Sequence, residues 1–478
     1  MSQRFQSYID GRWIAGADSA ADENPSDLGS PVGEYGSLNA AQVNEAIAAA
    51  AQAQRAWGLS SPQQRADALD FVGSEILARK EELGRLLAQE EGKTLPESIG
   101  EAARAGQIFK FFAGEALRIP GEKLASTRPG VDVEITREPV GVVGIIAPWN
   151  FPLAIPAWKI APALAYGNAV VFKPAEIVPG CAWALAEILS RAGLPAGVFN
   201  LAIGSGRVVG QALVENRGID ALSFTGSVPT GNRLLKQAAE RGLKIQLEMG
   251  GKNPLVVLAD ADLDKAVEIA VNGAYFSTGQ RCTASSRLIV EAPVYDEFIA
   301  RTRKRLQQIK VGNALAQGVD IGPVASRSQL ETDLSYLEIA RSEGAELLHG
   351  GELLELDTPG HYLSPALIAA QPQHRIAREE VFGPVAAVLR ADDYEHALAL
   401  ANDTEFGLCA GIATTSLKYA THFKRHAQAG MVMVNLPTAG VDPHVPFGGR
   451  KASSYGPREQ GRYAVEFYTT VKTAYTSA

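Results

Sequence analysis

Three side chains in glycine- or proline-flanked segments could carry out chemistry at a carbonyl group. Cys282 lies in GQRCTASSR, where the neighbouring Arg281 would favour a reactive thiolate. Glu248 lies in LEMGGKNP at the expected carboxyl end of a strand, where a carboxylate could act as a general base. Asn150 lies between the two prolines of PWNFP, a rigid turn that could aim its amide at a developing oxyanion. The local sequence thus offers a nucleophile, a base and an oxyanion donor.

Each of these residues also has a purely structural interpretation. A single cysteine is more often a small buried apolar side chain than a nucleophile. Cys181 and Cys409, in an expected helix and an expected apolar strand, fit that description better than Cys282 does. A glutamate before a Gly-Gly turn often only caps or solvates the turn, and PWNFP could be no more than a bulky turn. The local sequence alone therefore leaves the role of Cys282 open.

The histidines identify no base for a cysteine hydrolase. All seven follow residue 348, in polar or helical segments without an obvious thiol partner. His422 and His426 share a helix face at i, i+4, but no HExxH pattern surrounds them. We expect a solvated helix face there and no metal site.

Further polar groups at strand ends could bind a dinucleotide. KPAE offers Lys173 as a cation and Glu176 as an acceptor for ribose hydroxyl groups. FTGSVPTG runs from a strand into the start of a helix, where free amides and the helix dipole favour phosphate. GSGRVVG does the same after another strand, although neither segment is a standard GxGxxG motif.

The elements that must position these residues alternate between strands and helices. Residues 40–117 have helical periodicity, and apolar runs such as GVVGIIA, NAVVFK, GVFNLA and IDALSFTG then alternate with helical segments. Continuous apolar strands separated by helices predict a doubly wound α/β fold, with ligands at the carboxyl ends of the strands. A second α/β series begins near residue 254, and YIDGRWI at the start predicts a hairpin.

The composition excludes several other classes of protein. A chain of 478 residues predicts two or three domains. A net charge of −8 argues against nucleic-acid binding, and the apolar segments are too short to span a membrane. Three cysteines without CxxC spacing support neither a disulfide framework nor a structural zinc site. With no apolar leader at the start, we expect a cytoplasmic protein.

Taken together and in order, seven motifs resemble the aldehyde dehydrogenase superfamily. They are PWNFP, KPAE, FTGS, LEMGGKNP, GQRCTA, EEVFGPV and PFGGRK, and they cover most of the chain. The resemblance implies that Cys282 is the nucleophile, Glu248 the general base, and Asn150 with the Cys282 amide the oxyanion hole. It places Lys173 among both the catalytic and the cofactor-binding residues. An aldehyde would then be oxidised through a cysteine thiohemiacetal and a thioester, which water hydrolyses to a carboxylic acid.

The resemblance also implies a nicotinamide dinucleotide site. A carboxylate at Glu176 would accept bonds from a ribose 2′-hydroxyl and repel a 2′-phosphate, which favours NAD while leaving NADP possible. The implied cofactor-binding residues are Ile146, Ala147, Trp149, Lys173, Glu176, Gly206, Gly210, Phe224, Gly226, Ser227, Glu380 and Phe382.

The substrate is less well defined by the sequence. By resemblance the entrance is lined by Phe151, Trp158, Arg281, Thr283 and Phe447. Arg281 could bind a distal carboxylate, or it could point to solvent or to a structural partner.

The carboxyl-terminal tail, with Ser454 where relatives have Gly and with an added Pro457, resembles the branch that oxidises α-ketoglutaric semialdehyde. Against this, some acidic-semialdehyde enzymes have Arg where this chain has Trp158. Succinic or glutaric semialdehyde and aromatic aldehydes remain open.

The family fold implies three parts. These are a cofactor domain (1–118 with 140–247 and 438–457), a catalytic domain (248–437) and a β arm (119–139 with 458–478). Such arms pair across subunits, so a homodimer or homotetramer is implied. Two other classes remain as alternatives: a non-catalytic binding protein that retains the fold, and a cysteine hydrolase without a cofactor.

Overall fold

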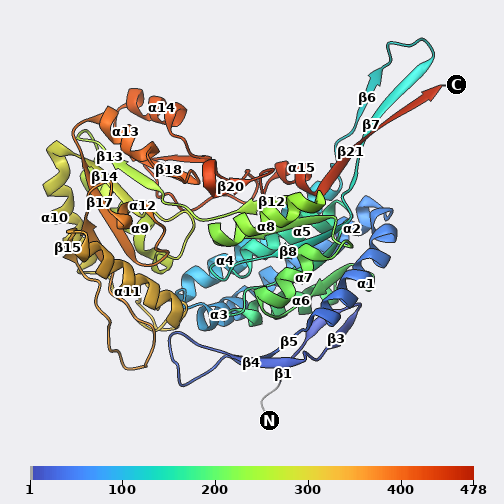
Figure 1. Ribbon diagram of the computed structural model, residues 1–478, viewed down its shortest axis with the longest axis horizontal. Helices are drawn as coiled ribbons and strands as arrows, with labels where there is room; N and C mark the ends of the chain where they lie inside the picture. The colour runs from blue at the N-terminus through green and yellow to red at the C-terminus, as the bar shows by residue number, and fades with distance from the viewer. Residues whose placement is uncertain (1–3, 478) are drawn as a thin grey trace.

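The computed structural model describes residues 4–477, which form two lobes and a projecting arm (Figure 1). The first lobe contains an eight-stranded sheet and the second a seven-stranded sheet. Helices cover both sheets, so each lobe is an α/β unit, as the alternation of strands and helices predicts. The boundaries of the three predicted domains stay a prediction.

The sheet of the first lobe has the order β20-β12-β11-β8-β9-β10-β2-β3. Its five central strands run parallel to one another, whereas β20, β2 and β3 join antiparallel at the two edges. The strands are β2 (Ser7–Ile9), β3 (Arg12–Ile14), β8 (Val142–Ile146), β9 (Ala169–Lys173), β10 (Phe199–Leu201), β11 (Ala221–Thr225), β12 (Lys244–Glu248) and β20 (Ser454–Tyr455).

The hairpin expected around Asp10 and Gly11 is confirmed. Strands β2 and β3 pair antiparallel, and both turn residues have positive φ, 51° and 75°. A two-residue turn of this hand matches the twist of the strands, and a glycine at its second position avoids the steric cost.

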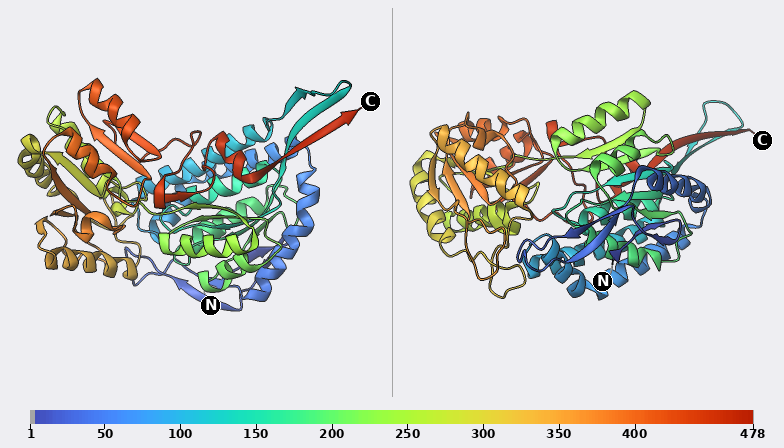
Figure 2. Two further views of the ribbon diagram at one scale, coloured as in Figure 1. Left: turned by 45° about the horizontal axis from the view of Figure 1, so that its top comes forward. Right: turned by 60° about the horizontal axis from the view of Figure 1, so that its bottom comes forward.

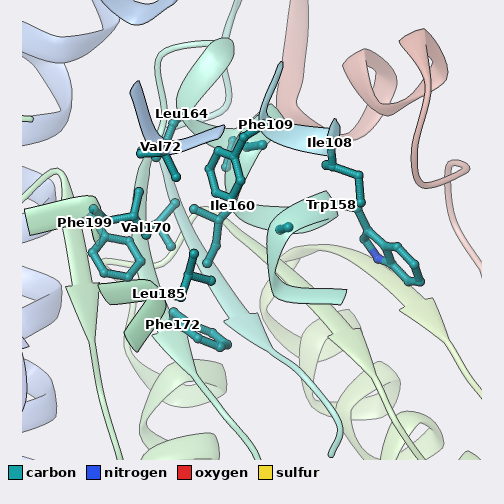
Figure 3. Packing of buried hydrophobic residues seen from close by; sticks show 14 of the residues in the cluster. Val72, Ile108, Phe109, Trp158, Ile160, Leu164, Val170, Phe172, Leu185 and Phe199 are labelled. Carbon is teal, nitrogen blue, oxygen red and sulfur yellow. The ribbon is translucent and has the colours of Figure 1, made fainter. Parts of the chain in front are cut away.

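Both faces of this sheet are buried under helices. Alternate residues of β8 and β9 project to opposite sides, so Val143 and Val170 lie in one apolar cluster while Val142 and Val171 lie in another. Figure 3 shows the first cluster, in which Phe172 and Phe199 pack near Ile160. The helices of this lobe are α1 (Ala40–Gly58), α2 (Pro62–Ala78), α3 (Lys80–Glu90), α4 (Leu95–Ala116), α5 (Ala154–Ala165), α6 (Pro179–Ser190), α7 (Gln211–Glu215), α8 (Val228–Arg241) and α15 (Val465–Tyr468).

The sheet of the second lobe has the order β15-β16-β17-β14-β13-β18-β19. All of its pairs are parallel except β15 with β16. Its strands are β13 (Pro254–Val257), β14 (Arg287–Glu291), β15 (Glu346–His349), β16 (Ala366–Ala369), β17 (Val385–Ala391), β18 (Cys409–Ala413) and β19 (Met431–Val434). Its helices are α9 (Leu263–Tyr275), α10 (Tyr295–Leu306), α11 (Arg327–Ser342), α12 (Arg375–Arg378), α13 (Tyr394–Asn402) and α14 (Leu417–His426).

The arm is a three-stranded antiparallel sheet that projects from the first lobe (Figure 2). Strand β7 (Val131–Pro139) lies between β6 (Glu122–Ala125) and β21 (Thr469–Ser477). The outer strands β6 and β21 of the arm carry the exposed apolar side chains Leu124, Val471 and Tyr475.

Another small sheet joins β1 (Arg4–Phe5), β5 (Gly33–Ser37) and β4 (Asp18–Asp22), and the sequence patterns did not predict it. Within residues 4–477, no helix is both long and apolar enough to cross a membrane.

Candidate active site

A cavity of about 350 Å³ lies where the first lobe meets the loop that carries Cys282. Cys282 lines it, as do all five residues expected at the substrate entrance: Phe151, Trp158, Arg281, Thr283 and Phe447. The Trp158 and Phe447 rings are stacked with centroids 5.3 Å apart. In Figure 3 the Trp158 indole points away from the other labelled core side chains. The cavity therefore brings the predicted nucleophile and the predicted substrate residues together.

The loop before Cys282 has an unusual backbone. Ser277, Thr278 and Gly279 all have positive φ, at 51°, 56° and 66°. For the two non-glycine residues this conformation is strained, and it persists only where surrounding contacts enforce it. At Gly279 any side chain would also clash with the carbonyl oxygen of Gly383.

Glu97 of helix α4 supplies the contacts that hold this loop. Its Oε1 accepts hydrogen bonds from the Ser277 amide (2.9 Å) and hydroxyl (3.0 Å). The same oxygen forms an ion pair with Arg281 Nη2 at 3.0 Å. Arg281 Nη2 also donates to Ser277 Oγ at 2.9 Å. Of the two interpretations of Arg281, the structure shows the structural partner, although the side chain still borders the cavity.

The surroundings of Cys282 disfavour its thiolate form. Burial raises its pKa above the ordinary range, and the negative charges of Glu380 and Glu248 raise it further. The carbonyl oxygen of Cys282 accepts a hydrogen bond from Asn253 Nδ2 at 2.8 Å, which fixes the backbone of the residue. Both carboxylates predicted to act at the site thus lie near enough to affect the thiol.

Glu248 is buried at the end of β12, as expected. Its pKa is raised well above the ordinary value by burial and by Glu459, while a hydrogen bond from Ser454 Oγ opposes the shift. Ser454 belongs to the carboxyl-terminal tail, so this hydroxyl comes from a segment far from Glu248 in the sequence. It also accepts a hydrogen bond from the Gly449 amide at 2.7 Å, which orients it.

Asn150 is buried beside the same loop. Its Nδ2 donates to the Gln280 carbonyl oxygen at 2.9 Å. The backbone carbonyl oxygen of Asn150 accepts a hydrogen bond from Lys93 Nζ at 2.7 Å. An amide carries two N–H donors, and only one of them is needed for Gln280.

The Gly-Gly turn after Glu248 allows two close approaches. The Gly251 amide donates to Glu380 Oε1 at 2.8 Å, and a side chain at Gly250 would clash with that carboxylate. Burial raises the pKa of Glu380 to about 7. Nearby, Phe382 has a positive φ of 69°, and its ring meets Trp149 edge to face with centroids 5.4 Å apart.

Several residues predicted to bind the cofactor lie together at the carboxyl ends of β8 and β9. Glu176 Oε1 accepts a hydrogen bond from the Gly206 amide at 2.8 Å. A side chain at Gly210 would lie 3.8 Å from both Ile146 and Lys173. Ala147 is bonded through its amide to the carbonyl oxygen of Lys173 at 3.1 Å. Burial lowers the pKa of Lys173 to about 8, and Glu176 opposes this shift.

The end of β11 leads directly into helix α8. The Gly226 amide donates to the carbonyl oxygen of Glu248 at 3.0 Å, and a side chain at Gly226 would clash with the Phe224 ring. Ser227 is the N-cap residue, yet its hydroxyl donates to Thr230 Oγ1 rather than accepting from a helix amide. The amides of the first turn thus have no bond from the cap side chain, which suits an anionic ligand.

Sequence reasoning missed four charged residues that line the cavity: Lys93, Glu97, Glu101 and Arg104. Glu97, Glu101 and Arg104 lie on one face of α4, and their i, i+4, i+7 spacing in PESIGEAAR could have indicated that shared face. Charged residues on a helix usually face solvent, so the pattern gave no reason to place them inside. Among the described residues, no group of three or more His, Cys, Asp or Glu side chains forms a candidate metal site.

Comparison with known proteins gives a consistent result. Residues 13–474 match the aldehyde dehydrogenase family. The chain is 44% identical over 477 residues to the alpha-ketoglutaric semialdehyde dehydrogenase of Bacillus subtilis, covering 98% of each chain. It is 41% identical to the alpha-ketoglutarate semialdehyde dehydrogenase of Haloferax volcanii, over the whole of both chains.

Among solved structures, the betaine aldehyde dehydrogenase of Staphylococcus aureus in complex with NAD⁺ aligns with a TM-score of 0.96. It is 34% identical in sequence, and the alignment covers 99% of this chain and 95% of that one. The chain belongs to the aldehyde dehydrogenase family, and it is an aldehyde dehydrogenase.

Proposed function

We propose that this aldehyde dehydrogenase oxidises a small acidic semialdehyde, with α-ketoglutaric semialdehyde as the favoured substrate, to the corresponding dicarboxylate. The observation that carries the proposal is the cavity in which Cys282 lies beside cationic and aromatic side chains. The names of the two relatives, and the tail with its Ser454, support the same substrate.

Each step of the reaction has a candidate residue. The Cys282 thiol first gives its proton to solvent water, and the resulting thiolate attacks the aldehyde carbon. The oxyanion that forms accepts hydrogen bonds from the second Asn150 N–H and from the Cys282 amide. Loss of a hydride leaves a thioester on Cys282. Glu248 then takes a proton from water, which hydrolyses the thioester to the acid and frees the thiol. A raised pKa suits Glu248 to accept that proton. Because transfer to coenzyme A would need no such base, we propose the hydrolytic reaction.

The residues at the strand ends fit a nicotinamide dinucleotide. Lys173 and Glu176 offer a donor and an acceptor for ribose hydroxyls, and the first turn of α8 offers amides to the pyrophosphate. Glu380 would accept bonds from the second ribose. When bound, the cofactor accepts the hydride released by the substrate. We propose NAD as the preferred form because Glu176 repels a 2′-phosphate, and the NAD⁺-bound structural relative supports this. A clear preference for NADP in catalytic efficiency would contradict it.

We also propose that the arm pairs with a second subunit, giving a homodimer or homotetramer. Its open strand edges and the exposed Leu124, Val471 and Tyr475 support this, because unpaired edges are otherwise an aggregation risk. The three cysteines are free, and a nucleophilic thiol must stay reduced. This supports a reducing compartment such as the cytoplasm.

The test is a panel of acidic, aliphatic and aromatic aldehydes with NAD and NADP, followed by cofactor reduction. We expect the highest kcat/KM for α-ketoglutaric semialdehyde, with succinic and glutaric semialdehydes next. Glu248→Gln should give a stoichiometric burst of reduced cofactor without steady turnover. A higher efficiency with aromatic aldehydes would refute the substrate. Full turnover by Glu248→Gln would refute the role of the base.

A further inference from the structure

The cationic side chains that line the cavity differ in how they are neutralised. Lys93 Nζ pairs with Glu101 Oε2 at 2.7 Å, and Arg281 Nη2 pairs with Glu97 Oε1 at 3.0 Å. In both pairs the charge already has a carboxylate partner inside the protein. The third cation, Arg104, forms no ion pair with any residue from 4 to 477.

The contacts that Arg104 does make leave most of its donors unused. Nη2 donates to Gln460 Oε1 at a long 3.3 Å, and the buried Nε has no hydrogen-bond partner in the described chain. The guanidinium carbon lies 5.8 Å from the centre of the Trp158 ring. Burying a polar group without a hydrogen-bond partner costs free energy. A ligand that accepts hydrogen bonds from Arg104 would remove that cost.

The electrostatic surroundings of Arg104 also favour the binding of an anion. Burial lowers its pKa, and the negative charges of Glu101, Asp442 and, in its ionised form, Cys282 oppose that shift. The guanidinium therefore lies within electrostatic reach of the reacting sulfur, although it contacts none of these groups as an ion pair. An anionic ligand would supply the compensation that the protein itself does not.

We propose that Arg104 binds the carboxylate of the semialdehyde while the aldehyde group lies at Cys282, so that Arg104 sets the preference for acidic substrates. This inference rests on the proposed function and names the residue that recognises the substrate. A guanidinium has the fork geometry to hold a carboxylate through two hydrogen bonds, and the stacked Trp158 and Phe447 rings border the same space.

Arg281 is the less suitable anchor. Its Nη2 donates hydrogen bonds to Glu97 and Ser277, and its Nη1 donates to the Asn272 carbonyl oxygen at 3.4 Å. The same reasoning argues against a cationic aldehyde in this cavity. A quaternary ammonium group would face the uncompensated charge of Arg104.

The experiment compares two five-carbon aldehydes that differ only in charge at the far end, glutaric semialdehyde and pentanal. The wild type should prefer the acid. In Arg104→Met, kcat/KM for the acid should fall about 30-fold or more, mainly through KM, as expected when one partner of a buried charged pair is removed. The value for pentanal should change by less than about 3-fold, within the range of small packing effects. Arg104→Lys keeps the charge without the fork and should give a smaller loss with the acid.

The outcomes separate the two proposals. A wild type that oxidises both aldehydes equally well would overturn the acidic substrate and, with it, the role of Arg104. A wild-type preference that survives in Arg104→Met, or a loss of equal size with both aldehydes, would overturn only the Arg104 assignment. NAD affinity and melting temperature, measured on each variant, show whether the fold is retained. If Arg104→Met does not fold, the ratio of acid to pentanal efficiency in Arg104→Lys decides.

Discussion

The dinucleotide edge, where β8, β9 and β11 end, and the aldehyde cavity around Cys282 are built in different ways. At the edge, Lys173 and Ser227 are placed by their own strand or helix, and their bonds run to near neighbours such as Pro174 and Thr230. In the cavity, the proposed nucleophile Cys282 follows a segment with three residues of left-handed backbone. A carboxylate from the other lobe holds them in place.

The difference indicates that affinity and chemistry depend on separate parts of the molecule. Regular elements position the residues that we propose to bind ribose and phosphate, whereas the loop before Cys282 needs contacts from the other lobe to stay in a strained form. Substitutions at the edge should therefore change cofactor affinity, and substitutions in the cavity should change turnover or stability. Four variants test this separation.

Cys282→Ser should have the largest effect and should be confined to the cavity. We expect kcat to fall on the order of 10⁴-fold or more, because a hydroxyl is a much weaker nucleophile at neutral pH. NAD affinity, measured by fluorescence titration, should stay close to the wild-type value. A comparable loss of NAD affinity would show that the two regions are not separate.

Glu97→Gln should weaken the contacts that hold the loop before Cys282, while Cys282 itself is unchanged. Because Arg281 then loses its partner, we expect a loss of about 2 kcal/mol in the free energy of unfolding, as for a pair partly open to solvent. Displacement of the loop should lower kcat roughly 100-fold. Chemical denaturation and steady-state kinetics measure the two effects. Glu338→Gln, which breaks an exposed pair with Arg341, is the control and should change neither.

Lys173→Met should weaken the edge and spare the cavity. Loss of a charged donor should raise the Kd for NAD about tenfold, while KM for the aldehyde stays the same. With a pKa of about 8, Lys173 loses its charge as the pH rises through that value. Relative to the variant, the wild type should therefore lose affinity for NAD between pH 7 and pH 9. Parallel pH dependence in both proteins would contradict this assignment.

Ser454→Gly should have the smallest effect, and it should depend on pH. The Ser454 hydroxyl stabilises the Glu248 carboxylate, so its removal raises the pKa of the base further. Because Glu248, as the proposed base, must be ionised to act, the acidic limb of the kcat profile should move to higher pH. Loss of one hydrogen bond to a charged group corresponds to roughly a tenfold lower rate on that limb. An unchanged profile would mean that the hydroxyl does not govern the base.

The sequence predicted the strand ends better than the cavity. Lys173, Glu176 and Glu248 could be placed because apolar runs, turn residues and helix starts are local signals. The ion pair of Arg281 with Glu97 could not be read in this way, since it depends on how the two lobes meet. Arg104 was missed for a different reason, because a charge in a helical pattern is ordinarily assigned to solvent.

The ion pair between Glu97 and Arg281 also affects the order in which the chain folds. Its two residues are 184 positions apart. Contacts of such long sequence separation carry a large closure entropy and tend to form late. The strands of the second lobe pair over shorter separations than this, so that sheet can form before the reactive loop reaches its strained form. We expect the recovery of dehydrogenase activity during refolding to follow the docking of the two lobes.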